Sequence, residues 1–111
     1  ADTGAVGAAE RLHDFLPGEG RPDGAATDCE GYYWSAGVQG GRLNRISPDG
    51  EIVEIYQMPF AGPTMPCFGG PDLKTLYVTS PTTGEGTARA QGTLIAFDAP
   101  VAGAPVQRFA L

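Results

Sequence analysis

Short runs of aliphatic and aromatic residues, separated by turn-forming residues, make up most of the chain. The runs lie at 32–36, 42–47, 51–56, 75–80, 93–98 and 106–110. Segments rich in glycine and proline lie between them, at 40–41, 48–50, 62–63 and 69–72. Short strands of this kind, with a turn about every ten residues, predict an all-β fold that is a sandwich, a barrel or a propeller.

The segment 42–56 predicts an antiparallel hairpin. Pro48 presets φ for the turn, Asp49 can bond its own backbone, and Gly50 tolerates the left-handed conformation. The same tripeptide occurs earlier, at residues 22–24, in a different setting.

A repeat within the chain separates the three all-β alternatives. Residues 32–36 align with 76–80 at an offset of 44, and Pro22 aligns with Pro66 at the same offset. Four short strands in a period of about 40–50 residues are the blade repeat of a β-propeller. We therefore expect two four-stranded blades, at 21–62 and 63–111, and one edge strand within 1–20 that belongs to a preceding blade.

Two blades do not close a ring, because propellers typically have at least four. An isolated pair would expose a broad apolar face and open strand edges. The chain is therefore predicted to be the C-terminal part of a larger propeller, or one part of an assembly that completes the ring. Its expected partners include the remaining N-terminal blades of the same propeller.

Composition and charge exclude several classes of partner. The formal net charge is −6, and no Lys/Arg cluster is available to neutralise a phosphate backbone, so nucleic acid is excluded as a partner. No apolar run approaches the roughly 20 residues that cross a bilayer, and residues 1–13 lack the features of a signal peptide. No membrane association is expected, and a cytoplasmic location is the default.

The chain has two cysteines, Cys29 and Cys67, too few for a disulfide scaffold and not at the spacing of a zinc site. We expect both to be small buried side chains. A single bridge or a reactive thiol is the alternative.

Asp23 is the main candidate for chemistry. The innermost strands of a propeller line its channel, and Pro22-Asp23-Gly24 opens such a strand, so the carboxylate could point at the axis. Oxygen ligands suit a hard divalent cation. The alternative is a plain Asp-Gly turn, which is our interpretation of Asp49 because it joins two outer strands.

The other polar and aromatic candidates favour structural roles. Asp28, Glu30 and Asp72 are interpreted as turn residues rather than further ligands, and Trp34 as packed between blades rather than stacked on a sugar. The only histidine, His13, falls in the predicted outer strand, which disfavours a Ser-His-Asp triad. The Gly-x-Gly within 81–91 precedes no helix, so we reject phosphate binding there.

Residues 21–80 closely resemble the SMP-30/gluconolactonase/regucalcin family. The shared motifs stand in order: Pro-Asp-Gly (22–24), Asp-x-Glu-Gly leading to Trp (28–34), Gly-Gly-Arg (40–42), a second Pro-Asp-Gly (48–50) and Cys-Phe-Gly-Gly-Pro-Asp (67–72). The family fold is a six-bladed propeller. On this resemblance the chain corresponds to its last two blades and one more strand.

The resemblance implies a specific function. The family binds one divalent cation (Ca, Zn, Mg or Mn) in the channel and includes hydrolases of small sugar lactones. Asp23 maps onto a metal ligand that is also assigned as the base activating water. The other ligands, a Glu and an Asn, belong to blades without a counterpart here, so this chain alone is expected to be inactive. A calcium-binding regulatory propeller and a non-catalytic scaffold propeller are the alternatives.

Overall fold

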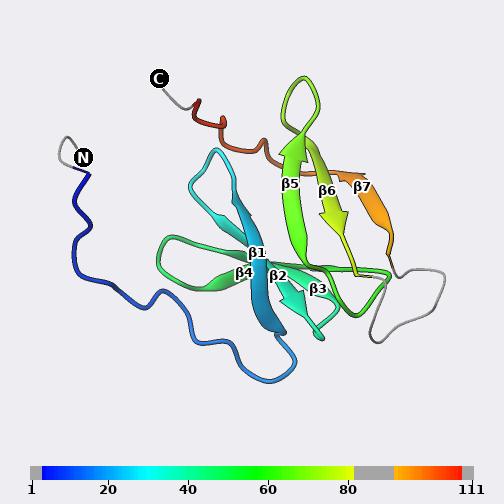
Figure 1. The fold of residues 1–111 in the computed structure, drawn as a ribbon, viewed down its shortest axis with the longest axis horizontal. Coiled ribbons are helices and arrows are strands. Elements are labelled where there is room, and N and C mark those ends of the chain that lie inside the picture. Colours follow the sequence, from blue (N-terminus) through cyan, green and yellow to red (C-terminus); the bar gives the residue numbers. More distant parts are fainter. Residues whose placement is uncertain (1–3, 82–91, 109–111) are drawn as a thin grey trace.

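The protein consists of two antiparallel β-sheets that lie side by side (Figure 1). The structure is a computed structural model that describes residues 4–81 and 92–108. The first sheet contains β1 (Arg21–Thr27), β2 (Tyr33–Val38), β3 (Arg42–Ile46) and β4 (Ile52–Gln57). The second contains β5 (Met65–Gly69), β6 (Thr75–Thr79) and β7 (Leu94–Asp98). The all-β prediction is confirmed, whereas most of the loop 81–91 lies outside the described residues.

Each sheet is a meander in which consecutive strands are neighbours. The predicted offset of 44 is confirmed, because Pro22 and Pro66 occupy the first strands, β1 and β5, while the aligned segments 32–36 and 76–80 occupy β2 and β6. The first strands lie next to one another (Figure 1), and the Gly24 amide donates a 2.7 Å hydrogen bond to the Thr64 carbonyl. This is the arrangement expected of the inner strands of adjacent blades.

The predicted hairpin is formed by β3 and β4. Its turn is closed by hydrogen bonds from the Ser47 amide to the Glu51 carbonyl (2.8 Å) and from the Gly50 amide to the Ser47 carbonyl (2.9 Å). Gly50 has a φ of 88°, a conformation that favours glycine. Asp49 is exposed at the tip, as expected of a turn residue.

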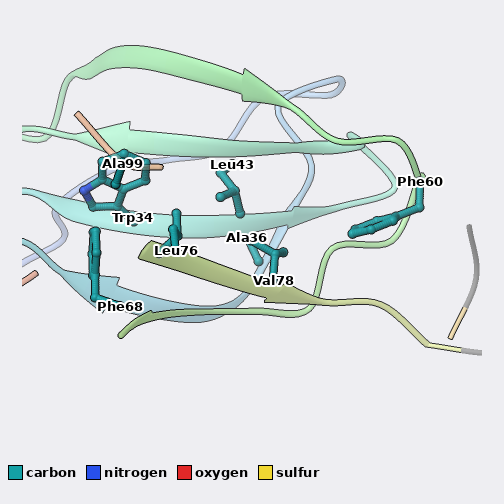
Figure 2. Packing of buried hydrophobic residues seen from close by; sticks show 8 residues of the cluster. All are labelled: Trp34, Ala36, Leu43, Phe60, Phe68, Leu76, Val78 and Ala99. Carbon is teal, nitrogen blue, oxygen red and sulfur yellow. The ribbon is translucent and has the colours of Figure 1, made fainter. Parts of the chain in front are cut away.

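The hydrophobic core lies between the two sheets (Figure 2). Trp34 of β2 is fully buried and meets the ring of Phe68 edge-on, with 5.5 Å between the ring centroids. Leu76 and Val78 of β6 complete the contact from the second sheet. Since a buried large apolar side chain contributes about 1.5–3 kcal/mol, this interface holds the sheets together. The prediction that Trp34 packs between blades is confirmed.

One strand predicted for the second blade is not formed. Residues 106–108 pair with no strand and Val106 is 85% exposed, while 109 and 110 lie outside the described residues. After β7 the chain crosses to the first sheet instead of turning back along β7. Residues 102–104, here called the C-terminal staple, donate or accept three hydrogen bonds: Cys29 amide to Ala102 carbonyl (2.9 Å), Ala104 amide to Thr27 carbonyl (2.9 Å) and Gly103 amide to Leu73 carbonyl (2.8 Å).

The edge strand expected within 1–20 is also absent from the described part, residues 4–20. The segment pairs with neither of the two sheets, and side-chain contacts described below hold it instead. The blade limits at 1–20, 21–62 and 63–111 stay a prediction.

Both outward faces of the pair of sheets carry exposed large hydrophobic side chains. Those on the first sheet are Tyr33, Val53 and Ile55, and those on the second are Met65, Tyr77 and Leu94. The apolar faces expected of an isolated pair of blades are therefore present. No helix within residues 4–81 and 92–108 is long and apolar enough to span a membrane.

Candidate functional site

Asp23 lies on β1, the strand of the first sheet that is next to the second sheet. Its side chain is exposed and lines an open cavity of about 350 Å³ together with Arg21, Pro22 and Val38. The pairing of β1 with β2 is irregular between Pro22 and Ala25, so Asp23 sits where the regular ladder is interrupted. Such bulges redirect side chains beside functional sites.

Gly24 fixes the backbone next to Asp23. A Cβ at this position would lie 2.6 Å from the Thr64 carbonyl oxygen and would collide with the Met65 side chain. The absence of a side chain at Gly24 thus allows close approach of the chain that leads into β5 of the neighbouring sheet. Together with the 2.7 Å hydrogen bond from the Gly24 amide to Thr64, it holds β1 against β5.

The Asp23 carboxylate is available to a ligand. No described residue donates a hydrogen bond to it or forms an ion pair with it. Within residues 4–81 and 92–108 there is no group of three or more His, Cys, Asp or Glu that could hold a metal ion. Asp23 therefore fits as one oxygen ligand of a hard cation, and it is not part of a cluster of three or more such side chains within the described residues. Its roles as ligand and base stay predictions.

The turn interpretation of the other acidic residues is confirmed. Asp28 Oδ1 accepts hydrogen bonds from the amides of Glu30 (2.9 Å) and Tyr32 (3.0 Å). Asp72 Oδ1 accepts one from the Lys74 amide (3.1 Å). None of these acidic residues lines the Asp23 cavity.

A buried ionic network around Arg45 is not predicted by our sequence analysis. Arg45 Nε donates to Asp28 Oδ2 (2.9 Å), which also accepts from Trp34 Nε1 (2.8 Å), and the guanidinium extends to Glu30 (2.9 Å) and Glu54 (2.6 Å). Burial opposes ionisation of Asp28, but the hydrogen bonds from Trp34, Tyr32 and Arg45 outweigh it and hold its pKa below the ordinary value. The signal that could have revealed part of the network is the position of Arg45 opposite Glu54 in the predicted hairpin.

The cysteine prediction is wrong. Cys29 and Cys67 are both free and both exposed. Cys29 follows Asp28 in the turn, where the buried position belongs to the aspartate. Cys67 occupies an outward position of β5, whose buried positions belong to Pro66 and Phe68.

His13 is not in a strand but anchors the segment that precedes β1. Its Nδ1 lies 2.8 Å from the Gly50 carbonyl oxygen and its Nε2 lies 3.0 Å from Glu19 Oε2. Both partners accept hydrogen bonds, so only the protonated imidazolium donates to both. Glu19 also accepts from the Leu16 amide (2.8 Å), so residues 12–20, here called the N-terminal strap, are held against the β3–β4 turn.

The strap extends the site. Phe15, Leu16, Pro17 and Gly18 line one side of a second cavity of about 310 Å³. Arg21, Pro22 and Val38 line both this cavity and that of Asp23. The two cavities are therefore adjacent.

The strap is expected to be sensitive to pH. The hydrogen bond to Glu19, and next that to Gly50, raise the pKa of His13, while the bond from His13 lowers the pKa of Glu19. The raised His13 pKa stabilises the fold fully below its unfolded value of about 6.5 and no longer does so once the pH exceeds the folded pKa. The lowered Glu19 pKa stabilises the fold at pH values above the pKa that Glu19 has in the unfolded chain. This contribution is lost as the pH falls through the folded pKa.

An NMR titration of His13 measures this effect directly. We expect a pKa above 6.5 that returns toward 6.5 in Glu19→Gln. Asp14→Asn is the control, because Asp14 is exposed and contributes least to the shift. An unshifted His13, or an equal response to both substitutions, would contradict the interaction.

Comparison with known proteins places these features in a family context. Residues 1–82 match the profile of the SMP-30/Gluconolactonase/LRE-like region. The 6-deoxy-6-sulfogluconolactonase of Pseudomonas putida is 51% identical over 80 residues, which are 71% of this chain and 28% of that protein. Pentonolactonase XacC of Haloferax volcanii is 37% identical over 113 residues, covering 94% of this chain and 39% of the relative. Regucalcin of Xenopus laevis is 40% identical over 83 residues, which are 74% of this chain and 28% of that protein.

Comparison with solved structures points to the same family. A regucalcin from Agrobacterium tumefaciens, described as a calcium-binding protein, superposes with a TM-score of 0.73 at 30% identity over 88% of this chain and 34% of its own. A luciferin-regenerating enzyme superposes with a TM-score of 0.61 at 29% identity, and the match covers 80% of this chain and 33% of the enzyme's chain. Both are propellers, so the two sheets are part of a β-propeller. The chain spans less than two fifths of the length of each of these relatives.

Proposed function

Since the chain belongs to the SMP-30/gluconolactonase/LRE-like family, we propose that it forms part of a divalent-metal-dependent lactonase that hydrolyses an aldonolactone to the aldonic acid. The position of Asp23 carries the proposal. Its carboxylate is exposed on the inner strand β1, faces a cavity of about 350 Å³, and has no partner among the described residues.

We assign two roles to this chain, both to the Asp23 carboxylate: it transfers one proton and it is one ligand of the cation. A divalent cation bound by Asp23 supplies polarisation of the lactone carbonyl. The Asp23 carboxylate accepts the proton of the attacking water. The water oxygen bonds to the carbonyl carbon, the ring C–O bond breaks, and the proton passes to the ring oxygen, which becomes the hydroxyl of the aldonic acid.

The names of the relatives define the substrates to test first, which are gluconolactones and pentonolactones. The remaining metal ligands and sugar contacts are assigned to the other blades of the propeller. One carboxylate seldom retains a metal ion, so the 111-residue chain by itself is expected to be inactive.

Metal removal tests the proposal in the complete protein that carries this chain. We expect chelation to reduce lactone hydrolysis to the spontaneous rate, since the cation supplies the carbonyl polarisation. Acid release at constant pH, corrected for uncatalysed opening, measures the rate. Readdition of Ca²⁺, Zn²⁺, Mg²⁺ or Mn²⁺ separately identifies the ion. Hydrolysis that persists after complete chelation would contradict metal dependence.

A calcium-binding propeller with little turnover is the second candidate, and the description of the Agrobacterium regucalcin as calcium-binding supports it. The two candidates differ in one measurement. Ca²⁺ binding by calorimetry without turnover of any gluconolactone or pentonolactone would favour the second candidate.

A further inference from the structure

Arg21 and Asp23 share one wall of the candidate site. They stand two residues apart on β1, with Pro22 between them, and line the same cavity of about 350 Å³. Arg21 also lines the adjoining cavity of about 310 Å³, which extends to Phe15 and Leu16 of the N-terminal strap. A molecule that reaches Asp23 from the strap therefore passes Arg21.

The Arg21 guanidinium has no partner in the part of the chain that the structure describes. No carboxylate of residues 4–81 or 92–108 lies within ion-pair distance of it, not even Asp23. The chain is acidic, with 13 Asp and Glu against 7 Lys and Arg. In the same structure Arg45 binds three carboxylates and Arg11 binds Asp14.

An unpaired guanidinium beside the reacting carboxylate is suited to bind an anionic group of a ligand. Its five donors lie in one plane and match the oxygens of a sulfonate, phosphate or carboxylate. Asp23 is assigned to the reacting carbonyl, so an anionic substituent remote from that carbonyl would lie at the other end of the site, beside Arg21. Arg21 supplies the attractive end.

We propose that Arg21 binds an anionic substituent of the substrate, remote from the lactone carbonyl, and thereby selects anionic aldonolactones over neutral ones. This inference rests on the proposed function and specifies its substrate class. A sulfonate and a phosphate share the required chemistry.

Lactone selectivity of the complete protein tests the proposal. The substrates are glucono-1,5-lactone, its 6-phosphate and its 6-deoxy-6-sulfonate, which differ only at C6. We expect the wild type to prefer the charged lactones and Arg21→Gln to lower their kcat/KM by about 10–100-fold, the size of a lost charge-assisted contact. Turnover of the neutral lactone should change less than about twofold, which also shows that the variant folds.

Two further variants sharpen the result. Arg21→Lys keeps the charge but loses the paired donors, so it should retain part of the preference. Arg11→Gln removes the same charge from an exposed position outside both cavities and should have no effect. The relative rates for the phosphate and the sulfonate show which anion the site accepts better.

The outcomes separate the two proposals. If the neutral lactone is hydrolysed but the wild type shows no preference for charge, or Arg21→Gln affects all three lactones equally, the inference about Arg21 is wrong and the lactonase proposal stands. If none of the lactones is hydrolysed, the proposed function fails and the inference fails with it.

Discussion

Asp23→Asn in the complete protein is expected to lower kcat/KM for a hydrolysed lactone by about 10²–10⁴-fold, the usual contribution of a positioned general base. Asparagine keeps the size of the side chain but neither accepts the proton of the attacking water nor offers a charged ligand. The exposed position of Asp23 makes a loss of stability small by comparison. Steady-state kinetics and a metal titration of the same variant measure the two roles separately.

The second Pro-Asp-Gly provides the matched control. Asp49 has the same neighbours in sequence but is exposed at the tip of the β3–β4 turn, away from both cavities. Asp49→Asn should leave activity and metal affinity unchanged. Equal losses of activity in the two variants, or full activity in Asp23→Asn, would show that Asp23 has no role in catalysis or metal binding.

Asp28→Asn should destabilise the protein by about 3–5 kcal/mol, the range for breaking a buried ion pair. Asp28 is 1% exposed, and its two oxygens accept from Glu30, Tyr32, Trp34 and Arg45. An asparagine offers only one acceptor oxygen, so at least one buried donor loses its partner. Urea unfolding of the complete protein measures the loss.

Glu30→Gln is the comparison for this network. Glu30 also binds Arg45, at 2.9 Å, but its side chain is 54% exposed. Water replaces much of that contact, so we expect a loss below about 1 kcal/mol. A cost for Asp28→Asn no greater than that for Glu30→Gln would show that burial of the Asp28–Arg45 pair is not what stabilises the turn.

Local patterns predicted most of the fold. Five of the seven strands, β2, β3, β4, β6 and β7, follow the apolar runs, and the repeat at an offset of 44 places Pro22 and Pro66 in equivalent inner strands, β1 and β5. These features succeed because strand alternation and turn residues depend on neighbours in sequence. Asp28 and Trp34 were assigned correctly for the same reason.

Features that depend on distant partners were not predictable. An outer strand within 1–20 or 106–110 depends on pairing with a sheet remote in sequence, and residues 4–20 and 106–108 pair with neither sheet. The bonds of His13 to Gly50 and of Arg45 to Asp28 join segments whose separation in sequence carries no periodic signal. Nor did sequence alone show that Arg21 and Asp23 share a cavity.

The C-terminal staple has a consequence for how the chain acquires its structure. Thr27 and Cys29 obtain hydrogen-bond partners from Ala104 and Ala102, which follow β7 and are synthesised after all seven strands. Contacts between such remote positions raise the contact order and slow folding. During synthesis, the Thr27 carbonyl and the Cys29 amide at the end of β1 lack these hydrogen-bond partners until residues 102–104 have been added. Dissociation of 102–104 should therefore be an early step of unfolding, and it would expose the inter-sheet interface to aggregation.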